Sequence, residues 1–524
     1  MPESNTDDDE GSPLLGPQST AAATAAATTS RVAVAVIGDA SMFQTIINMA
    51  KTCMGTGCLV LPFAARRGGL LLHTVGLLVI ATWNIYTVQR LCSCLQYIPI
   101  ITAETSNSNN NGGDCDDGDG NNNNDDTYDN EQYTRARKGT KSAAPAAAPV
   151  PLPYKLYYTE HPPDETAMFG KVVFYAMGPR GLIVLDVLMV SFLLGILITY
   201  INAMRSFLRD TPITTGSAVV DAIGLIAIMG PMSCVPHMGY LARASATGLL
   251  VLVVTFVVLG MYGIDRYDED HLSTKTTITS SLSWWPENGL WGVSHWFGCV
   301  VFSFGVAPLT YNFRSSLADP DQMVPATTYA LMTVALIYMG LGIGFWIMFP
   351  SMQGDLLQEL PQTGWLPVMT RLAMVVVVLT TAPLLIVPCG ELIESKISHS
   401  VTRMMPFAAS NHTTGDDDNQ DHDDHHQFRR IVFRFGICFL GVGISLYVPG
   451  FVDVLSFVGC CCVACLGFCI PPLLHVLLCF QARRYRPWNK VTMMVDILML
   501  AWGIFATVIS TAYTFRQISI GNAR

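Results

Sequence analysis

Long apolar segments separated by polar ones dominate this chain of 524 residues. A helix that crosses a bilayer needs about 20 mostly apolar residues, whereas a strand of a membrane barrel needs about 10 alternating ones. The segments have the length of membrane-spanning helices. In lipid, a helical bundle of such segments forms all of the backbone hydrogen bonds internally. The pattern predicts an all-α membrane protein with eleven transmembrane helices, at 40–64, 70–96, 181–208, 216–238, 244–264, 290–311, 326–349, 365–389, 429–449, 452–480 and 490–514.

Composition agrees with a membrane protein, because 51% of the residues are apolar, 13% are charged and the mean hydropathy is +0.38. The net charge of −10 comes largely from acidic tracts at 7–10, 114–129 and 416–424, which are typical of solvated, disordered segments. We therefore expect a disordered cytosolic tail at 1–39, an eleven-helix domain at 40–515 and a C-terminal tail at 516–524. Disordered insertions are expected at about 102–153 and 408–427, and nothing indicates a nucleic-acid partner.

The distribution of Lys and Arg predicts the orientation in the membrane. Cytosolic loops carry an excess of these residues. With a cytosolic N-terminus and eleven spans, most of the Lys and Arg residues between spans fall on the cytosolic side. Both insertions are then cytosolic, and the C-terminus lies on the opposite face.

Two of the predicted spans contain residues that interrupt a helix. Residues 48–69 read "NMAKTCMGTGCLVLPFAARRGG", with Gly55-Thr56-Gly57 near the middle and Leu61-Pro62 after it, and residues 302–308 read "FSFGVAP". Either feature alone is also explained by a simple kink. Interruptions at matching places, five spans apart, indicate a transporter with an inverted repeat and a binding site at the breaks.

The expected break also indicates what is bound. Unwound backbone groups in hydrocarbon need partners, and a solute can provide them. The N-terminus of a half-helix favours a carboxylate, whereas carbonyl groups at the opposing end favour an ammonium group or a cation. A zwitterionic amino acid satisfies both.

The first interrupted segment resembles the first-helix signature of the amino acid/auxin permease family, most closely that of the proton-assisted amino acid transporters. The segments "FSFGVAP" with the later "ADP", "TTAPLLIVPCGELIESKI" at 380–397 and "LYVPGFVDVLSFVGCCCVACLGFCIPPLLH" at 446–475 are similar to later parts of the family. The resemblance implies eleven helices, a LeuT-like 5+5 inverted repeat plus one extra helix, and secondary transport of amino acids. No Ser/His/Asp or metal-site constellation appears in a plausible pocket, so we expect no enzyme activity, no cofactor and no metal.

The resemblance also implies which residues bind the substrate. Gly55, Thr56 and Gly57 would hold its carboxylate, and the segment from Phe302 would face them, with the phenylalanines as an aromatic gate. Tyr200 would close the pocket, although a packing role explains it equally well. Relatives often carry a glutamate at the position of Gly305, so the substrate side chain is left open. The expected substrate-binding residues are Gly55, Thr56, Gly57, Tyr200, Phe302, Ser303, Phe304 and Gly305.

Lys51 is expected to couple transport to protons. Sodium-coupled relatives have a polar neutral residue near this position, and a lysine ammonium group can replace the ion and release its proton in a low-dielectric site. Asn48, one turn earlier, is its expected partner, and Thr380 and Thr381 are expected to line the cation site. The alternatives are a lysine that reaches the interface and hydroxyl groups that bond their own helix.

The N-terminal tail contains "EGSPLL", which has the acidic-dileucine form read by sorting adaptors of the endosomal pathway. Glu10, Leu14 and Leu15 are its key residues. The sequence thus predicts a proton-coupled amino acid symporter of the vacuolar or lysosomal membrane, with the plasma membrane as the alternative. A sodium-coupled carrier, or an amino-acid sensor that signals through its cytosolic tails, is the alternative function.

Overall fold

The computed structural model describes residues 38, 40–98, 162, 166–233, 238–273, 282–352, 354–404, 419–448, 450–483 and 489–522. These ranges are helical and contain no strand, only an isolated bridge between Ala40 and Leu317. Within them, eight helical stretches are long and apolar enough to cross a membrane, and two shorter apolar helices accompany them at Ala218–Ser233 and Ile431–Tyr447. The predicted all-α membrane class is therefore confirmed.

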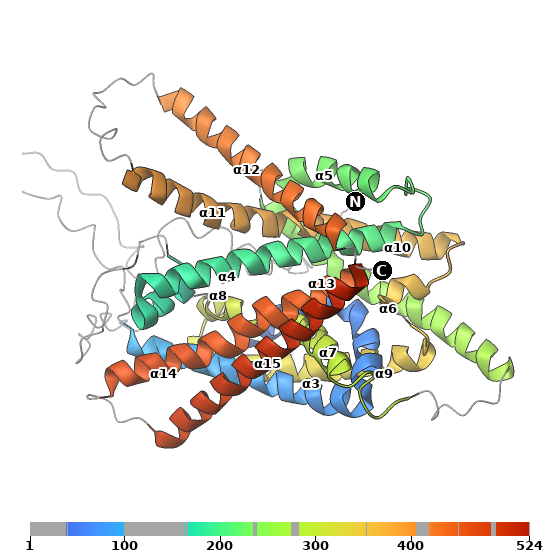
Figure 1. The fold of residues 1–524 in the computed structure, drawn as a ribbon, viewed down its shortest axis with the longest axis horizontal. Helices are drawn as coiled ribbons and strands as arrows, with labels where there is room; N and C mark the ends of the chain where they lie inside the picture. Colours follow the sequence, from blue (N-terminus) through green and yellow to red (C-terminus); the bar gives the residue numbers. More distant parts are fainter. Residues whose placement is uncertain are drawn as a thin grey trace, which may run out of the picture.

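The helices follow the predicted spans closely (Figure 1). Three predicted spans are divided: the first between α2 and the start of α3, the sixth between α7 and α8, and the eighth between α10 and α11. The helices are α2 (Met42–Cys53), α3 (Leu61–Cys94), α4 (Met168–Leu208), α5 (Ala218–Ser233), α6 (Met238–Ser273), α7 (Leu290–Ser303), α8 (Thr310–Ser316), α9 (Met323–Met348), α10 (Trp365–Thr381), α11 (Pro383–Met404), α12 (Asn419–Tyr447), α13 (Phe451–Val458), α14 (Ile470–Ala482) and α15 (Lys490–Asn522).

Two helices extend into segments that the sequence analysis assigned to a loop or a tail. Helix α12 begins at Asn419, so the second half of the expected disordered insertion at 408–427 is helical. Helix α15 continues to Asn522 and includes most of the expected tail at 516–524, because no glycine or proline interrupts it before Gly521. The other insertion, at 102–153, and nearly all of the tail at 1–39 lie outside the described residues.

Gly69 bends α3 where the first span passes into the second. Its φ of 74° is in the left-handed region that favours glycine. A Cβ atom there would also lie 2.6 Å from the carbonyl oxygen of Trp285, so the site excludes a side chain. Gly69 therefore separates two helices within α3, the end of the first span and the whole of the second.

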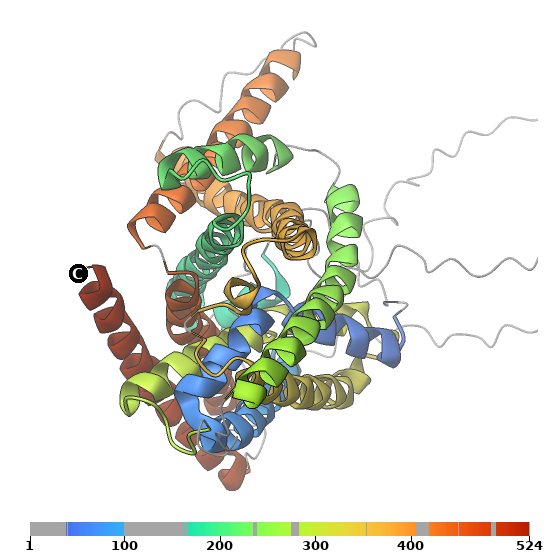
Figure 2. The same ribbon diagram turned by 90° about the vertical axis from the view of Figure 1, so that its right-hand side faces the viewer.

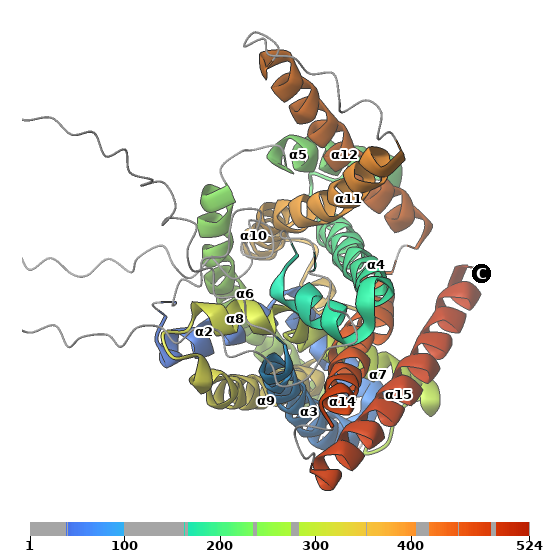
Figure 3. The same cartoon turned by 90° about the vertical axis from the view of Figure 1, so that its left-hand side faces the viewer.

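The helices form two groups that face each other (Figures 2 and 3). In one group, α3 packs against α7 and α9, and α2 packs against α9. In the other, α4 packs against α10, α11 and α12, and α5 packs against α12. Helix α13 contacts both α4 and α7 and so joins the two groups. Both broken spans that carry the candidate site belong to the first group.

Glycines bring the tenth predicted span close to α7. A Cβ atom at Gly459 would lie 2.0 Å from the carbonyl oxygen of Gly298, so these two backbones touch. In lipid there is no hydrophobic driving force for helices to associate. Small residues instead allow the close van der Waals packing that holds helices together. The segments Gly459–Val463 and Cys465–Cys469 in this span are π-helical, a form that appears frequently at functional sites.

The helix ends that flank both long insertions lie at the same end of the bundle. The end of α3, the start of α4, the end of α11 and the start of α12 are all on the left in Figure 1. Two insertions at one end agree with the predicted topology, in which six spans separate them. We refer to this end, which the sequence predicts to be cytosolic, as the cytosolic end and to the other as the non-cytosolic end.

Candidate functional site

The first helix break lies at Met54 and Gly55. Helix α2 ends at Cys53, Met54 has a ψ of 70°, and Gly55 is extended before a short 3-10 turn, η2 (Thr56–Val60), leads into α3. Two glycines weaken the helix here, and Pro62 lacks the N–H group that a continuous helix would need. The break expected in the first span is therefore present.

The second break lies between α7 and α8. Helix α7 ends at Ser303, and Phe304 leaves the helical conformation with a ψ of 19°. A 3-10 turn, η5 (Ala307–Leu309), contains Pro308 and precedes α8. Gly305 and Pro308 thus interrupt the helix at their own positions, as Gly55 and Pro62 do in the first span.

The two breaks meet in space. A Cβ atom at Gly57 would lie 2.7 Å from the hydroxyl oxygen of Ser303 and 3.6 Å from the ring of Phe302. The hydroxyl of Tyr338 on α9 donates to the carbonyl oxygens of Cys53, at 2.7 Å, and Ser303, at 3.2 Å. One side chain that the sequence did not single out therefore joins both broken spans.

The first break has space and unused hydrogen-bonding capacity. A Cβ atom at Gly55 would meet no other atom within 4 Å. Thr56 is buried, with 7% of its surface exposed. Its hydroxyl oxygen has no hydrogen-bond partner among the described residues. Buried polar atoms are almost always paired, so this hydroxyl has hydrogen-bonding capacity that the described residues leave unused. The first N–H groups of η2 have no partner within that turn and can bind an anion.

The remaining predicted binding residues are packed to different degrees. Phe304 is fully buried, and its ring meets the edge of the Tyr338 ring at 5.2 Å between centroids. Phe302 and Tyr200 are partly buried and pack against the main hydrophobic core. The structure thus gives Phe304 a fixed partner, whereas Phe302 and Gly305 are more exposed at the second break.

The predicted coupling residues fall in two places. Asn48 and Lys51 lie on α2, which packs against α9, and Lys51 is half-buried in the last turn before the break. Thr380 and Thr381 end α10, which packs against α4 and α6. Both threonine hydroxyls donate to the carbonyl oxygen of Val377, which is the self-bonding alternative that the sequence left open. The sorting residues Glu10, Leu14 and Leu15 lie outside the described residues.

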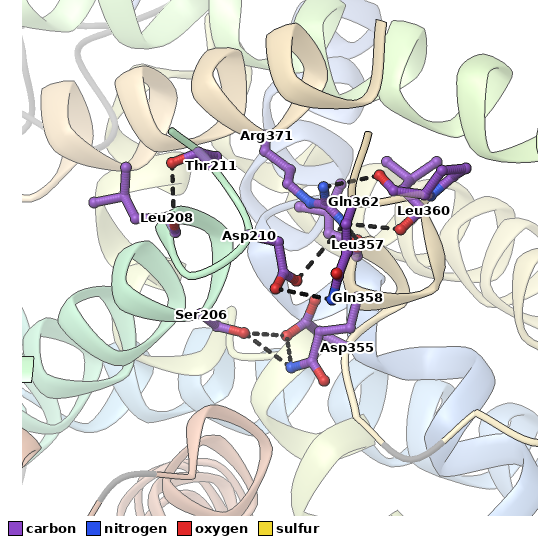
Figure 4. Close-up of polar contacts among 11 residues, drawn as sticks. Ser206, Leu208, Asp210, Thr211, Asp355, Leu357, Gln358, Leu360, Gln362 and Arg371 are labelled. Carbon is purple, nitrogen blue, oxygen red and sulfur yellow. Dashed lines mark hydrogen bonds and ion pairs between the residues drawn. The ribbon is translucent and has the colours of Figure 1, made fainter. Parts of the chain in front are cut away.

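A polar network closes part of the non-cytosolic end (Figure 4). Asp355, in the loop between α9 and α10, is 0% exposed, and its Oδ2 accepts hydrogen bonds from Ser206, at 2.7 Å, and Gln358, at 2.8 Å. Arg371 on α10 donates to the carbonyl oxygens of Leu357, Leu360 and Pro361, at 3.2, 2.8 and 3.0 Å. These bonds hold the loop against the end of α4.

Beside this loop lies a cavity of about 600 Å³, which is open at the non-cytosolic end. Its lining includes Phe63, two residues from Leu61 at the start of α3, together with Arg205, Gln358 and Asp453. A vestibule with charges of both signs lies beside the α3 half of the first broken span. The loop that Asp355 and Arg371 hold forms part of its rim.

Arg371 and Asp355 are functional candidates that the sequence analysis missed. Arg371 had a signal, because a charged residue inside an apolar span is unusual and generally marks a role. Tyr338 had no such signal, since a lone tyrosine in the apolar stretch 323–348 is an ordinary packing residue.

The buried carboxyl group of Asp355 predicts how pH affects the loop. Burial raises the pKa of Asp355 above its usual value, although hydrogen bonds from Ser206 and Gln358 partly oppose the shift. The folded state therefore binds the proton more tightly than the unfolded state does, and stability is lost as the pH rises through the folded pKa. Asp355→Asn removes this loss, so we expect its melting temperature to exceed that of the unchanged protein increasingly as the pH rises from acidic to neutral.

Glu359→Gln is the matched control for this measurement, because Glu359 lies on the same loop in an ion pair with Arg266 at 3.2 Å. Other charged groups that face the network are Arg371 and Asp210, which lie 3.8 Å apart. We expect the melting temperature of Glu359→Gln not to rise relative to that of the unchanged protein as the pH increases. A difference between Asp355→Asn and the unchanged protein that is constant with pH would contradict the assignment.

Comparison with known proteins gives a match over most of the chain. Residues 38–111 and 155–516 match the family described as "Transmembrane amino acid transporter protein". The chain is 20% identical over 484 residues to the amino acid transporter ANT1 of Arabidopsis thaliana, covering 90% of this chain and 92% of that protein. It is 21% identical over 361 residues to the amino acid transporter AVT3B of the same plant, covering 67% and 78%. It is 22% identical over 278 residues to the vacuolar amino acid transporter 3 of Schizosaccharomyces pombe, covering 52% and 37%.

Proposed function

Because the chain belongs to the transmembrane amino acid transporter protein family and is not an enzyme, we propose that it is a secondary-active, proton-coupled symporter of small amino acids. The observation that carries the proposal is the meeting of two broken helices beside open space and an unpaired buried hydroxyl. Substrate would bind where these helices unwind. Its carboxylate would accept hydrogen bonds from the N–H groups of Thr56 and Gly57, since that of Gly55 already bonds Cys53, and its ammonium group would face carbonyl groups of the second break.

The arrangement of helices supports eleven spans with an inverted repeat. In such a fold, each span of the first five has an equivalent five spans later. The breaks of the first and sixth spans touch, α3 packs against α9, α4 packs against α10, and α5 packs against α12. Contacts between four equivalent pairs are expected around a pseudo-two-fold axis in the membrane plane. Helix α15 would be the extra span, and little of its apolar surface is buried.

The two groups of helices suggest how access alternates. The group with both breaks would rock against the group built on α4, α10 and α12, opening the site first to one face and then to the other. The cavity at the non-cytosolic end would be the entry route from that face. The aromatic residues Tyr200 and Phe302, which are partly buried, would close over the substrate.

Flux into proteoliposomes tests this function. Purified protein in liposomes should take up labelled amino acid, and a pH gradient directed toward the substrate-receiving side should increase the uptake. A panel of amino acids would identify the substrate. Binding without flux would instead support an amino-acid sensor, and uptake that needs sodium would support a sodium-coupled carrier.

We expect the protein in the vacuolar or lysosomal membrane, and the S. pombe relative is named as a vacuolar amino acid transporter. The tail sequence "EGSPLL" would bring it there by binding a sorting adaptor. Replacing both leucines, Leu14→Ala with Leu15→Ala, should redistribute the protein from the vacuole or lysosome to the plasma membrane. Fluorescence microscopy of the tagged protein measures this, and an unchanged distribution would show that the motif occurs there by chance.

A further inference from the structure

Tyr338 occupies a special position between the two broken spans. Cys53 is the last residue of α2 and Ser303 is the last residue of α7. Their carbonyl oxygens lie 2.7 and 3.2 Å from the Tyr338 hydroxyl oxygen, and the tyrosine is 0% exposed. One O–H group therefore serves the C-terminal ends of two half-helices.

The position has a negative electrostatic potential. Each helix C-terminus carries about half a negative charge, and here two such ends converge away from water. In secondary transporters, carbonyl groups at half-helix ends coordinate the coupling cation. In this chain, the positive end of a hydroxyl dipole takes the place that a cation would otherwise fill.

The hydroxyl is also linked to the substrate site. The carbonyl oxygen of Cys53 accepts a second hydrogen bond, at 2.8 Å, from the N–H group of Gly55, the first glycine of the break. The Tyr338 ring is itself fixed against Phe304 at the second break. A movement of the hydroxyl would therefore alter the backbone on both sides of the space that we assign to substrate.

We propose that Tyr338 is a positioning residue that holds the two half-helix ends together in place of a bound metal cation. The proposal rests on amino acid transport as the function. The hydroxyl would make sodium unnecessary at the junction of α2, α7 and α9, whereas Lys51 would do so at the separate cation site that Thr380 and Thr381 are expected to line. When the substrate leaves and the spans separate, the hydrogen bonds break without an ion being released.

The first test compares Tyr338→Phe with Tyr311→Phe. Tyr311 on α8 is also buried, and it donates to a backbone carbonyl, that of Leu91, at 2.9 Å. Each change therefore removes one hydroxyl that bonds a buried carbonyl. In Tyr338→Phe we expect the KM for amino acid uptake to rise at least tenfold, whereas Tyr311→Phe should keep the KM of the unchanged protein. A Tyr338→Phe protein that loses Vmax at an unchanged KM would show a merely structural role and overturn the proposal.

The second test uses sodium. Uptake by the unchanged protein should be the same in sodium and in choline. Tyr338→Ser empties the space between the two carbonyl oxygens, so sodium should lower its KM at least threefold relative to choline. Sodium-dependence of the unchanged protein, or the absence of any sodium effect on the KM of Tyr338→Ser, would overturn the proposal.

The third test does not depend on transport. Cys53 and Cys58 lie on either side of the first break and are both buried. Because the Cys58 thiol hydrogen-bonds the Tyr338 hydroxyl, its labelling would report the lost contact alone. In a chain that keeps only Cys53, a membrane-permeant maleimide should label Tyr338→Phe at least five times faster than Tyr311→Phe. Equal rates would overturn the role of Tyr338, whereas faster labelling without any amino acid flux would refute only the proposed function.

Discussion

Gly57→Val should abolish amino acid uptake, and Gly55→Ala should weaken it while leaving the fold intact. The two glycines differ in their surroundings. A Cβ atom at position 57 would lie 2.7 Å from the hydroxyl oxygen of Ser303, so a valine forces the two breaks apart. A Cβ atom at position 55 would meet nothing, and the backbone there, with φ at −108°, is open to alanine. Any loss in Gly55→Ala therefore reports on space that the substrate needs.

The expected size follows from the hydrogen bonds at stake. A bond to a charged group contributes about 1.5–3 kcal/mol, and each 1.4 kcal/mol is about tenfold in affinity. Displacing the carboxylate from one N–H group should raise the KM of Gly55→Ala by about ten- to a hundredfold. Initial rates of uptake into proteoliposomes measure this.

Gly340→Ala on α9 is the matched control, because its Cβ atom would also meet nothing within 4 Å and the residue is exposed at the surface of the bundle. It should transport as the unchanged protein does. Size-exclusion profiles and melting temperatures should show that all three variants are folded. Normal uptake by a folded Gly57→Val protein would remove the central claim of a site at the breaks.

The break positions were predictable from sequence because glycine and proline act on their own neighbourhood. Gly55, Pro62, Gly305 and Pro308 each weaken the helix in which they stand, whatever surrounds them. The meeting of the two breaks was inferred only from their matching placement. The ends of α12 and α15 were misjudged because polar residues that look like loop can continue a helix beyond the membrane.

Contacts between distant spans could not be predicted in the same way. Tyr338 reaches Cys53 from a helix that begins almost 300 residues later, and nothing local distinguishes it from a packing tyrosine. Asp355 reads as an ordinary loop aspartate, and only the fold buries it against Ser206. The self-bonding of Thr380 was an open alternative, because a threonine near a helix end can bond either its own backbone or a ligand.

Lys51→Ala should stop proton-driven uptake or uncouple it from the pH gradient. Lys51 is the last basic residue of α2 and lies half-buried just before the break, where the negative end of the half-helix dipole attracts its charge. A sodium ion added nearby would be repelled by this ammonium group, strongly so in a low-dielectric site. The lysine can also release its proton to one side of the membrane and regain a proton from the other side. A side chain whose charge never changes could not carry a proton in this way.

The variant Lys51→Arg distinguishes the role of the positive charge from the role of proton release. Arginine keeps a positive charge at the half-helix end but does not lose its proton in proteins. We expect Lys51→Arg to bind substrate and to exchange it across the membrane at close to the normal rate, yet to accumulate none in response to a pH gradient. Lys51→Ala should lose accumulation and show weaker binding as well. Counterflow measures exchange, and uptake with and without an imposed gradient measures accumulation.

A lysine that only extends toward the membrane interface would give a different pattern. Both variants would then accumulate amino acid normally, because neither the charge nor the proton would take part in transport. The positive charge could also serve only to stabilise the end of α2, in which case Lys51→Arg would accumulate substrate as the unchanged protein does. Proton-driven accumulation by Lys51→Ala, or by Lys51→Arg, would therefore exclude Lys51 as the proton carrier, whereas exchange without accumulation in Lys51→Arg would identify it.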